Sequence, residues 1–172
     1  MAARKTPPKA AATTRGRRYW LFKSEPDTYS FEQFQRDRRT NWNGVRNYQA
    51  RNLLRDEIAV GDGVLFYHSS TEPMAVVGVA RVIAAGYPDA TAFDPASPYH
   101  DPDSDPDEPT WFQVDIECVA PLRSAVTREQ CKAVPALRNM VLLQKGSRLS
   151  VQPVATDEWR AILELGGNKE TW

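Results

Sequence analysis

Apolar and polar residues alternate most regularly between Trp111 and Val119. The apolar positions are Phe112, Val114, Ile116 and Cys118, and the polar positions are Gln113, Asp115 and Glu117. A period of two is typical of a β-strand with one buried face. Because the other face is polar, we expect an antiparallel sheet that exposes this face to water. Shorter apolar runs predict four further strands. These are Tyr19–Lys23, Gly63–His68, Ala75–Ile83 and Arg148–Gln152.

Helical periodicity and capping residues predict five helices. They span Phe31–Arg36, Arg46–Glu57, Arg128–Ala133, Ala136–Leu143 and Asp157–Leu165. Ser30 and Gln33 have the spacing of a capping box at the first helix, while Thr156 and Gly166 are the predicted N-cap and stop of the last. Short strands scattered among helices, without regular strand–helix alternation, predict an α+β fold.

The segment between Gly86 and Pro109 is rich in proline and shows no periodicity, so we expect a loop there. Phe93 and Tyr99 are its large aromatic residues, and we expect them to anchor the loop. A chain of 172 residues is long enough for one domain with a buried core and too short for two.

No apolar run reaches the length of a membrane span, and the N-terminus lacks a signal peptide. We therefore expect a soluble intracellular monomer, cytoplasmic or nucleoid-associated in a bacterium and nuclear in a eukaryote. Cys118 and Cys131 are expected to be buried thiols, and with only two histidines we expect no metal site.

The net charge of zero hides an asymmetry along the chain. Residues 1–18 have six basic side chains and no acidic one, so the remainder carries about −6. This segment lacks large apolar residues before Tyr19, and we expect a disordered tail. It could contact phosphates, serve only as a solvated leader, or act as a transit peptide. An acidic globular part argues against a broad duplex-binding surface, so recognition should be local, in a pocket.

Candidate chemistry is concentrated in residues 40–51, where Trp42 lies beside Asn43 and Asn47. An aromatic face next to amide groups suits a flat heterocycle such as a nucleobase. The alternative is a tryptophan that only fills the core at the start of a helix.

Polar residues also follow two predicted strands. Lys23, Ser24 and Glu25 end the first, and could point into a pocket mouth or form a surface Lys–Glu pair. His68 and Ser69 end the second, and His68 is either a structural histidine or a ligand contact.

Basic residues near the predicted helix start and the last strand allow two interpretations. Arg148, Ser150 and Gln152 would share one strand face, toward either a pocket or water. Arg46 and Arg51 lie in or near the first helical turn, where a cation is unfavourable for the helix dipole. Such a placement indicates a specific partner.

Six segments occurring in one order resemble the EVE domain family, from about Tyr19 to Leu165. They are residues 19–26 (YWLFKSEP), 42–51 (WNGVRNYQAR), 67–70 (YHSS), 85–89 (AGYPD), 93–99 (FDPASPY) and 148–154 (RLSVQPV). The resemblance implies a PUA-like fold, a small curved β-barrel of mainly antiparallel strands flanked by helices, with residues 19–172 as one domain. One departure is Pro109-Thr110-Trp111, where the family usually has Pro-Arg-Trp.

The resemblance implies a non-catalytic module that binds a modified nucleobase, with modified cytosine in DNA as first choice and modified RNA as second. Under it Trp42 stacks on the base, while Ser24, Glu25 and Asn47 read the base edge. Lys23, Arg46 and Arg148 contact phosphate or carbonyl groups. The remaining predicted ligand-binding residues are Val45, Tyr48, His68, Ser69 and Ser150. No cofactor, metal or membrane is expected. The alternatives are a small hydrolase acting on a modified nucleoside, as in related ASCH domains, a free-nucleoside binder, and an adaptor using the acidic loop.

Overall fold

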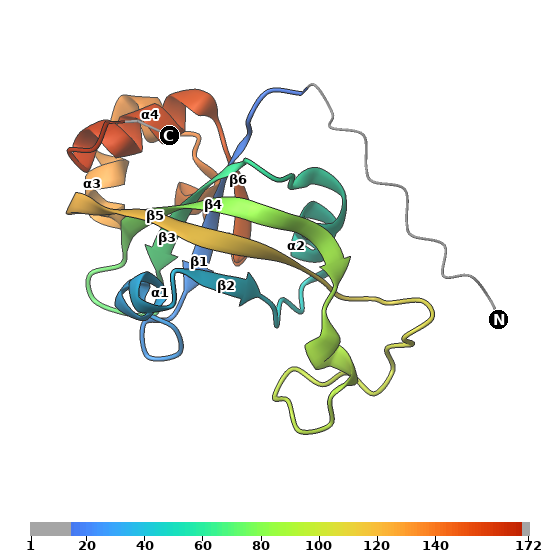
Figure 1. Cartoon of the computed structure of the whole chain (residues 1–172). Coiled ribbons are helices and arrows are strands. Elements are labelled where there is room, and N and C mark those ends of the chain that lie inside the picture. Colours follow the sequence, from blue (N-terminus) through green and yellow to red (C-terminus); the bar gives the residue numbers. More distant parts are fainter. Residues whose placement is uncertain (1–14, 170–172) are drawn as a thin grey trace.

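One six-stranded mixed sheet organises the computed structural model, which describes residues 15–169 (Figure 1). Its order is β2-β5-β4-β3-β1-β6, and every neighbouring pair is antiparallel except β1 with β3. The strands are β1 (Tyr19–Ser24), β2 (Arg39–Trp42), β3 (Gly63–His68), β4 (Ala75–Pro88), β5 (Phe112–Thr127) and β6 (Val151–Val154). The mainly antiparallel pairing is confirmed. The ladder does not close, however, since β2 and β6 lie at opposite ends, so the expected barrel is an open sheet.

Helices flank this sheet, and the α+β class is confirmed. The α-helices are α1 (Phe31–Asp37), α2 (Tyr48–Asn52), α3 (Arg128–Lys132) and α4 (Thr156–Leu165). A π-helical turn, Leu53–Glu57, continues α2, and single 3-10 turns occupy Ala90–Phe93, Pro135–Leu137 and Val141–Leu143. Figure 1 shows α3 and α4 on one side of the sheet and α1 on the other.

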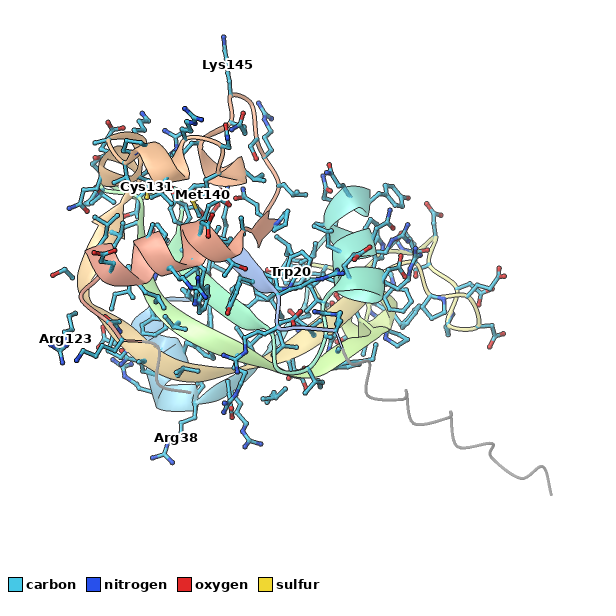
Figure 2. All side chains as sticks on the ribbon, turned by 90° about the horizontal axis from the view of Figure 1, so that it is seen from above. Trp20, Arg38, Arg123, Cys131, Met140 and Lys145 are labelled. Carbon is cyan, nitrogen blue, oxygen red and sulfur yellow. The ribbon has the colours of Figure 1, made fainter. Side chains whose placement is uncertain are left out.

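Two hydrophobic clusters cover the two faces of the sheet. Alternate residues of β1 enter different clusters: Trp20 and Phe22 pack with α1 and the α2 region, while Leu21 packs with α3 and α4. On the second face, Cys131 and Met140 lie buried between helices and sheet (Figure 2). Both cysteines are free thiols, Cys131 buried and Cys118 half-buried, and burial raises the pKa of Cys131 to about 11. A thiol with this pKa stays protonated near neutral pH.

The hairpin of β4 and β5 is longer than the sequence pattern predicts. Its register shifts at four places, between Val76 and Gly78, Val79 and Ala80, Val82 and Ala84, and Ala84 and Tyr87. Each irregularity changes which residues face a given side, so strict alternation ends while the pairing continues. The expected solvated face of β5 is also wrong in part: Gln113 is buried and donates to the Tyr87 hydroxyl.

Apart from the long hairpin, four elements differ clearly from the predictions. Strand β2 was not predicted, because its residues are mostly polar and it forms an edge of the sheet. The expected helix Ala136–Leu143 is two 3-10 turns, since its buried residues do not follow one helical face. Helix α2 begins at Tyr48, so the dipole argument does not apply to Arg46. Strand β6 begins at Val151, so Arg148 and Ser150 precede it and share no strand face with Gln152.

The helix caps agree with the sequence only in part. The Ser30 hydroxyl accepts from the Gln33 amide N–H at 3.1 Å, but the Gln33 side chain donates to Asp37, so the capping box is half formed. Thr156 is the first residue of α4, not its cap. The Glu158 carboxylate accepts from the Ala155 N–H at 2.9 Å instead, and Gly166 ends the helix as expected.

Most of the predicted basic tail, residues 1–14, lies outside the described residues. Its last part is described and contacts the domain. Arg15 donates to Asp62 at 2.9 Å and Arg18 to Glu57 at 2.8 Å. Asp62 is buried and also accepts from the Trp20 indole N–H at 2.9 Å. These contacts tie residues 15–18 to the end of the π-helical turn, at Glu57, and to the turn that precedes β3, at Asp62.

Candidate functional site

A cleft of about 780 Å³ opens where β1 and β2 end, beside the loop that joins β4 to β5. Polar groups and three aromatic side chains line it. The lining residues are Lys23, Ser24, Glu25, Thr28, Tyr29, Arg39, Thr40, Asn41, Trp42, Asn43, Gly44, Val45, Arg46, Tyr99 and Ser150. The cleft therefore brings together seven of the twelve residues that the sequence singled out, and adds Tyr29 and Tyr99 as further aromatic rings.

Trp42 belongs to both the core and the cleft. Its ring centroid lies 5.2 Å from that of Phe22 and 5.6 Å from that of Phe66, and the residue is 9 % exposed. The pairing of Trp42 with Val114 holds it at the end of β2, where the strand meets the cleft. The two interpretations of this tryptophan are thus compatible. Removing the whole ring would leave a hole in the core, so Trp42→Ala should destabilise the domain as well as weaken stacking.

Tyr99 borders the cleft from the Pro-rich loop, and sequence reasoning did not assign it to the site. Its ring lies against Gly44, where the Cβ of any larger residue would come within 2.8 Å of the ring atoms. Gly44 also has a φ of +77°, which favours glycine. Glycine is therefore required both for the turn after β2 and for the approach of Tyr99. In the sequence, the only feature that pointed to Tyr99 was that it is a large aromatic residue in the proline-rich loop.

Arg46 joins this loop to the segment after β2. Its guanidinium donates twice to the Tyr99 carbonyl, at 2.6 and 3.1 Å, and once to the buried Asp89 carboxylate at 3.0 Å. It also lies 5.2 Å from the ring centroid of Trp111. A phosphate contact by Arg46 would have to compete with these acceptors. Its clearest role in the structure is to hold the loop against the cleft.

Asp89 is the acceptor at the centre of the same network. It accepts from the Gly44 N–H at 2.8 Å and from the Thr91 N–H at 2.9 Å, besides the ion pair with Arg46. Burial alone would raise the pKa of Asp89, but the hydrogen bonds from Thr91, Gly44 and Arg46 outweigh it and lower the pKa. The carboxylate is therefore ionised near neutral pH.

The polar residues at the end of β1 do not act as one group. Ser24 donates to the Tyr29 carbonyl at 2.6 Å, which leaves its oxygen lone pairs to accept from a ligand. Glu25 accepts from Ser70 at 3.2 Å, and the alternative of a surface ion pair between Glu25 and Lys23 is not formed. Lys23 alternates with Ser24 along the strand, so its side chain lies over the other face of the sheet.

His68 has a structural partner. Its Nε2 accepts from the Phe31 N–H at 3.1 Å, at the start of α1, and burial lowers its pKa. A neutral imidazole with Nδ1 protonated satisfies this bond. Neither His68 nor the adjacent Ser69, whose N–H donates to the Ser24 carbonyl at 3.0 Å, lines the cleft.

Three more predicted residues lie outside the cleft lining. The Asn47 side chain caps α2 by accepting from the Ala50 N–H at 3.0 Å. Tyr48 is largely exposed and packs its ring 5.0 Å from that of Trp111. Arg148 is exposed in the loop before β6. At the position where the family usually has arginine, the Thr110 carbonyl accepts from Arg51 at 2.6 Å.

Within residues 15–169, no cluster of three or more His, Cys, Asp or Glu side chains has the arrangement of a metal site. In the same range, no helix is long and apolar enough to cross a membrane. The lining of the cleft is polar and aromatic, and such side chains interact by hydrogen bonding, stacking and ion pairing.

Comparison with known proteins places this site in a family. Residues 18–165 match the EVE domain. Thymocyte nuclear protein 1 of Mus musculus is 35 % identical over 166 residues, covering 86 % of this chain and 73 % of that protein. A crystal structure from Pseudomonas syringae has a TM-score of 0.82 at 44 % identity, covering 86 % of this chain and 99 % of the other.

The structure of human THYN1 protein in complex with DNA containing 5-methylcytosine is also similar. Its TM-score is 0.83 at 32 % identity, and the match covers 89 % of this chain and 99 % of that chain. The match to the family extends through the cleft, the loop and both hydrophobic clusters. This chain belongs to the EVE domain family.

Proposed function

We propose that this protein binds DNA carrying a modified cytosine and takes the modified base into the cleft. The observation that carries the proposal is the lining of the cleft, in which Trp42 and Tyr99 border a space edged by hydrogen-bonding groups. The 32 % identical human THYN1 protein, seen in complex with DNA containing 5-methylcytosine, supports this ligand class.

Base recognition follows from the residues that remain available. A nucleobase offers a flat face to the Trp42 and Tyr99 rings, and such stacking contributes about 1–3 kcal/mol per base. The exocyclic amine of cytosine is a donor. The free lone pairs of Ser24 and the Glu25 carboxylate are acceptors at the cleft. Val45 adds an apolar wall against which a methyl group could pack.

Cations near the cleft would hold the sugar–phosphate backbone. Arg39 lines the cleft with a side chain that is 73 % exposed, and its nearest carboxylate oxygen, on Glu117, is 3.8 Å away. Arg148 is exposed and makes no hydrogen bond or ion pair with any residue of the described range. Both therefore remain available to phosphate oxygens.

The test is a fluorescence-anisotropy titration of short oligonucleotides identical except at one cytosine. Burying one methyl group contributes about 0.8 kcal/mol, or about fourfold in affinity. We therefore expect at least that preference for 5-methylcytosine over cytosine. Matched duplex DNA, single-stranded DNA and RNA determine the class of nucleic acid. Equal affinity for methylated and unmethylated strands of every class would refute the proposal.

A further inference from the structure

A row of residues crosses four strands near the end of β1, on the sheet face opposite Ser24. Lys23 pairs with Tyr67, Tyr67 with Val76, and Val76 with Val126. Partners in a ladder point to the same face, and the last three all belong to the second hydrophobic cluster. Arg128 follows Val126 by two residues. Lys23 and Arg128 therefore lie at the two ends of this row, with Tyr67 beside Lys23.

Neither cation has a carboxylate partner within residues 15–169. No Asp or Glu oxygen of that range lies within 4.0 Å of the Lys23 ammonium or the Arg128 guanidinium. The acid beside Arg128 in sequence, Glu129, is paired with Lys132 at 2.7 Å. Within the described range the Arg128 guanidinium makes no hydrogen bond, while the Arg128 backbone N–H donates to the Met74 carbonyl at 2.9 Å.

The electrostatics of Lys23 show that the two cations interact. Burial lowers the pKa of Lys23, and the positive charge of Arg128 lowers it further. Burial also raises the pKa of Tyr67 to about 12, so its phenol stays a hydrogen-bond donor. The Tyr67 hydroxyl makes no hydrogen bond with the described residues and is not among their fully enclosed polar atoms, although the residue as a whole is only 1 % exposed. Half-buried like charges are unfavourable unless an anion compensates them.

We propose that Lys23, Arg128 and the Tyr67 hydroxyl form a phosphate-binding site. This inference rests on the proposed function, because its ligand would be the backbone phosphate adjoining the base held in the cleft. The end of β1 provides the connection, because Ser24, the residue after Lys23, lines the cleft from the opposite face of the same strand end. The site offers an ammonium, a guanidinium and a phenol, which together supply only donors to an anion.

The experiment compares Lys23→Gln and Arg128→Gln with the matched controls Arg123→Gln and Lys145→Gln. Figure 2 shows Arg123 and Lys145 pointing away from the body of the protein, and neither residue belongs to this row. Full-length proteins are titrated with methylated and unmethylated oligonucleotides at several salt concentrations, after a thermal melt confirms folding. Tyr67→Phe tests the hydroxyl while keeping the buried ring.

Lys23→Gln and Arg128→Gln should each reduce the slope of log affinity against log salt concentration by about 1. The ratio of affinities for methylated and unmethylated DNA should not change, because phosphate contacts position while base contacts specify. Tyr67→Phe should weaken binding to both DNAs without altering the slope. In a series of oligonucleotides with one neutral methylphosphonate each, one position should weaken binding of the wild type but not of the Lys23→Gln/Arg128→Gln protein.

The two proposals fail in different ways. If Lys23→Gln and Arg128→Gln have the same salt slopes as the controls Arg123→Gln and Lys145→Gln, the phosphate site is overturned. This holds whatever the base preference. If methylated and unmethylated DNA bind with equal affinity while Lys23→Gln and Arg128→Gln reduce the salt slope, only the proposal of base recognition is refuted. If the slopes do not change but inorganic phosphate raises the melting temperature of the wild type only, the site binds free phosphate and the backbone assignment is wrong.

Discussion

Replacing Asp89 by asparagine should loosen the loop that carries Tyr99. The Asp89 carboxylate accepts four hydrogen bonds, from Gly44 at 2.8 Å, Arg46 at 3.0 Å, and the Thr91 N–H and hydroxyl at 2.9 and 2.5 Å. Asparagine has nearly the same shape but only one acceptor oxygen. If that oxygen stays with Thr91, the new NH₂ group faces the Gly44 and Arg46 donors.

The cost follows from the burial of this network. Asp89 is fully buried, and the Arg46 side chain that would lose its counter-charge is 24 % exposed. Breaking a buried ion pair by removing one partner costs about 3–5 kcal/mol. Because water reaches part of Arg46, we expect the lower end, about 3 kcal/mol. For a domain of this size that corresponds to a drop in Tm of about 6–12 °C.

Urea denaturation measures the free energy of unfolding directly, with Asp103→Asn as the control, because Asp103 is exposed in the same loop. The double variant Arg46→Gln/Asp89→Asn should recover part of the loss, since no unpaired charge remains. An Asp89→Asn protein within about 0.5 kcal/mol of wild type, the range of ordinary surface substitutions, would refute the reasoning.

Four further outcomes are expected. Trp42→Ala should destabilise the fold by about 3–5 kcal/mol, whereas Trp42→Phe should retain most stability and lose affinity for the base; equal binding by Trp42→Phe would remove the stacking role. Because the pKa of His68 is lowered in the fold, its bond to Phe31 contributes stability above pH about 6.5, and this contribution is lost as the pH falls below that value. The difference in Tm between wild type and His68→Gln should therefore shrink on acidification. Gly44→Ala should be destabilising through both its φ of +77° and its clash with Tyr99, which thermal melting would show. Mass spectrometry after incubation with modified nucleosides should find no product, and turnover abolished by Glu25→Gln would favour a hydrolase instead.

Local sequence patterns determined most of the sheet and helices. The apolar run of residues 19–23 and the alternation after Trp111 predicted β1 and the start of β5, because a strand with a buried face must repeat every two residues. The end of α4 at Gly166 was also predictable, because the end of a helix favours a residue that can leave the helical conformation. Family resemblance added the ligand class, and Trp42 as a residue of the pocket.

Only the tertiary structure decided how the candidate residues are used. Arg46 meets Asp89, 43 residues away, and Tyr99 reaches Gly44 across a proline-rich loop. Such contacts join segments that are far apart in the sequence, and the register shifts of β4 and β5 that precede the loop leave no local pattern in the sequence. The same holds for Lys23: its residue type indicated a cation near a pocket, but strand pairing put its ammonium on the face shared with Arg128. The local sequence determines the chemistry of each side chain, whereas the alignment of distant strands determines which partner that side chain meets.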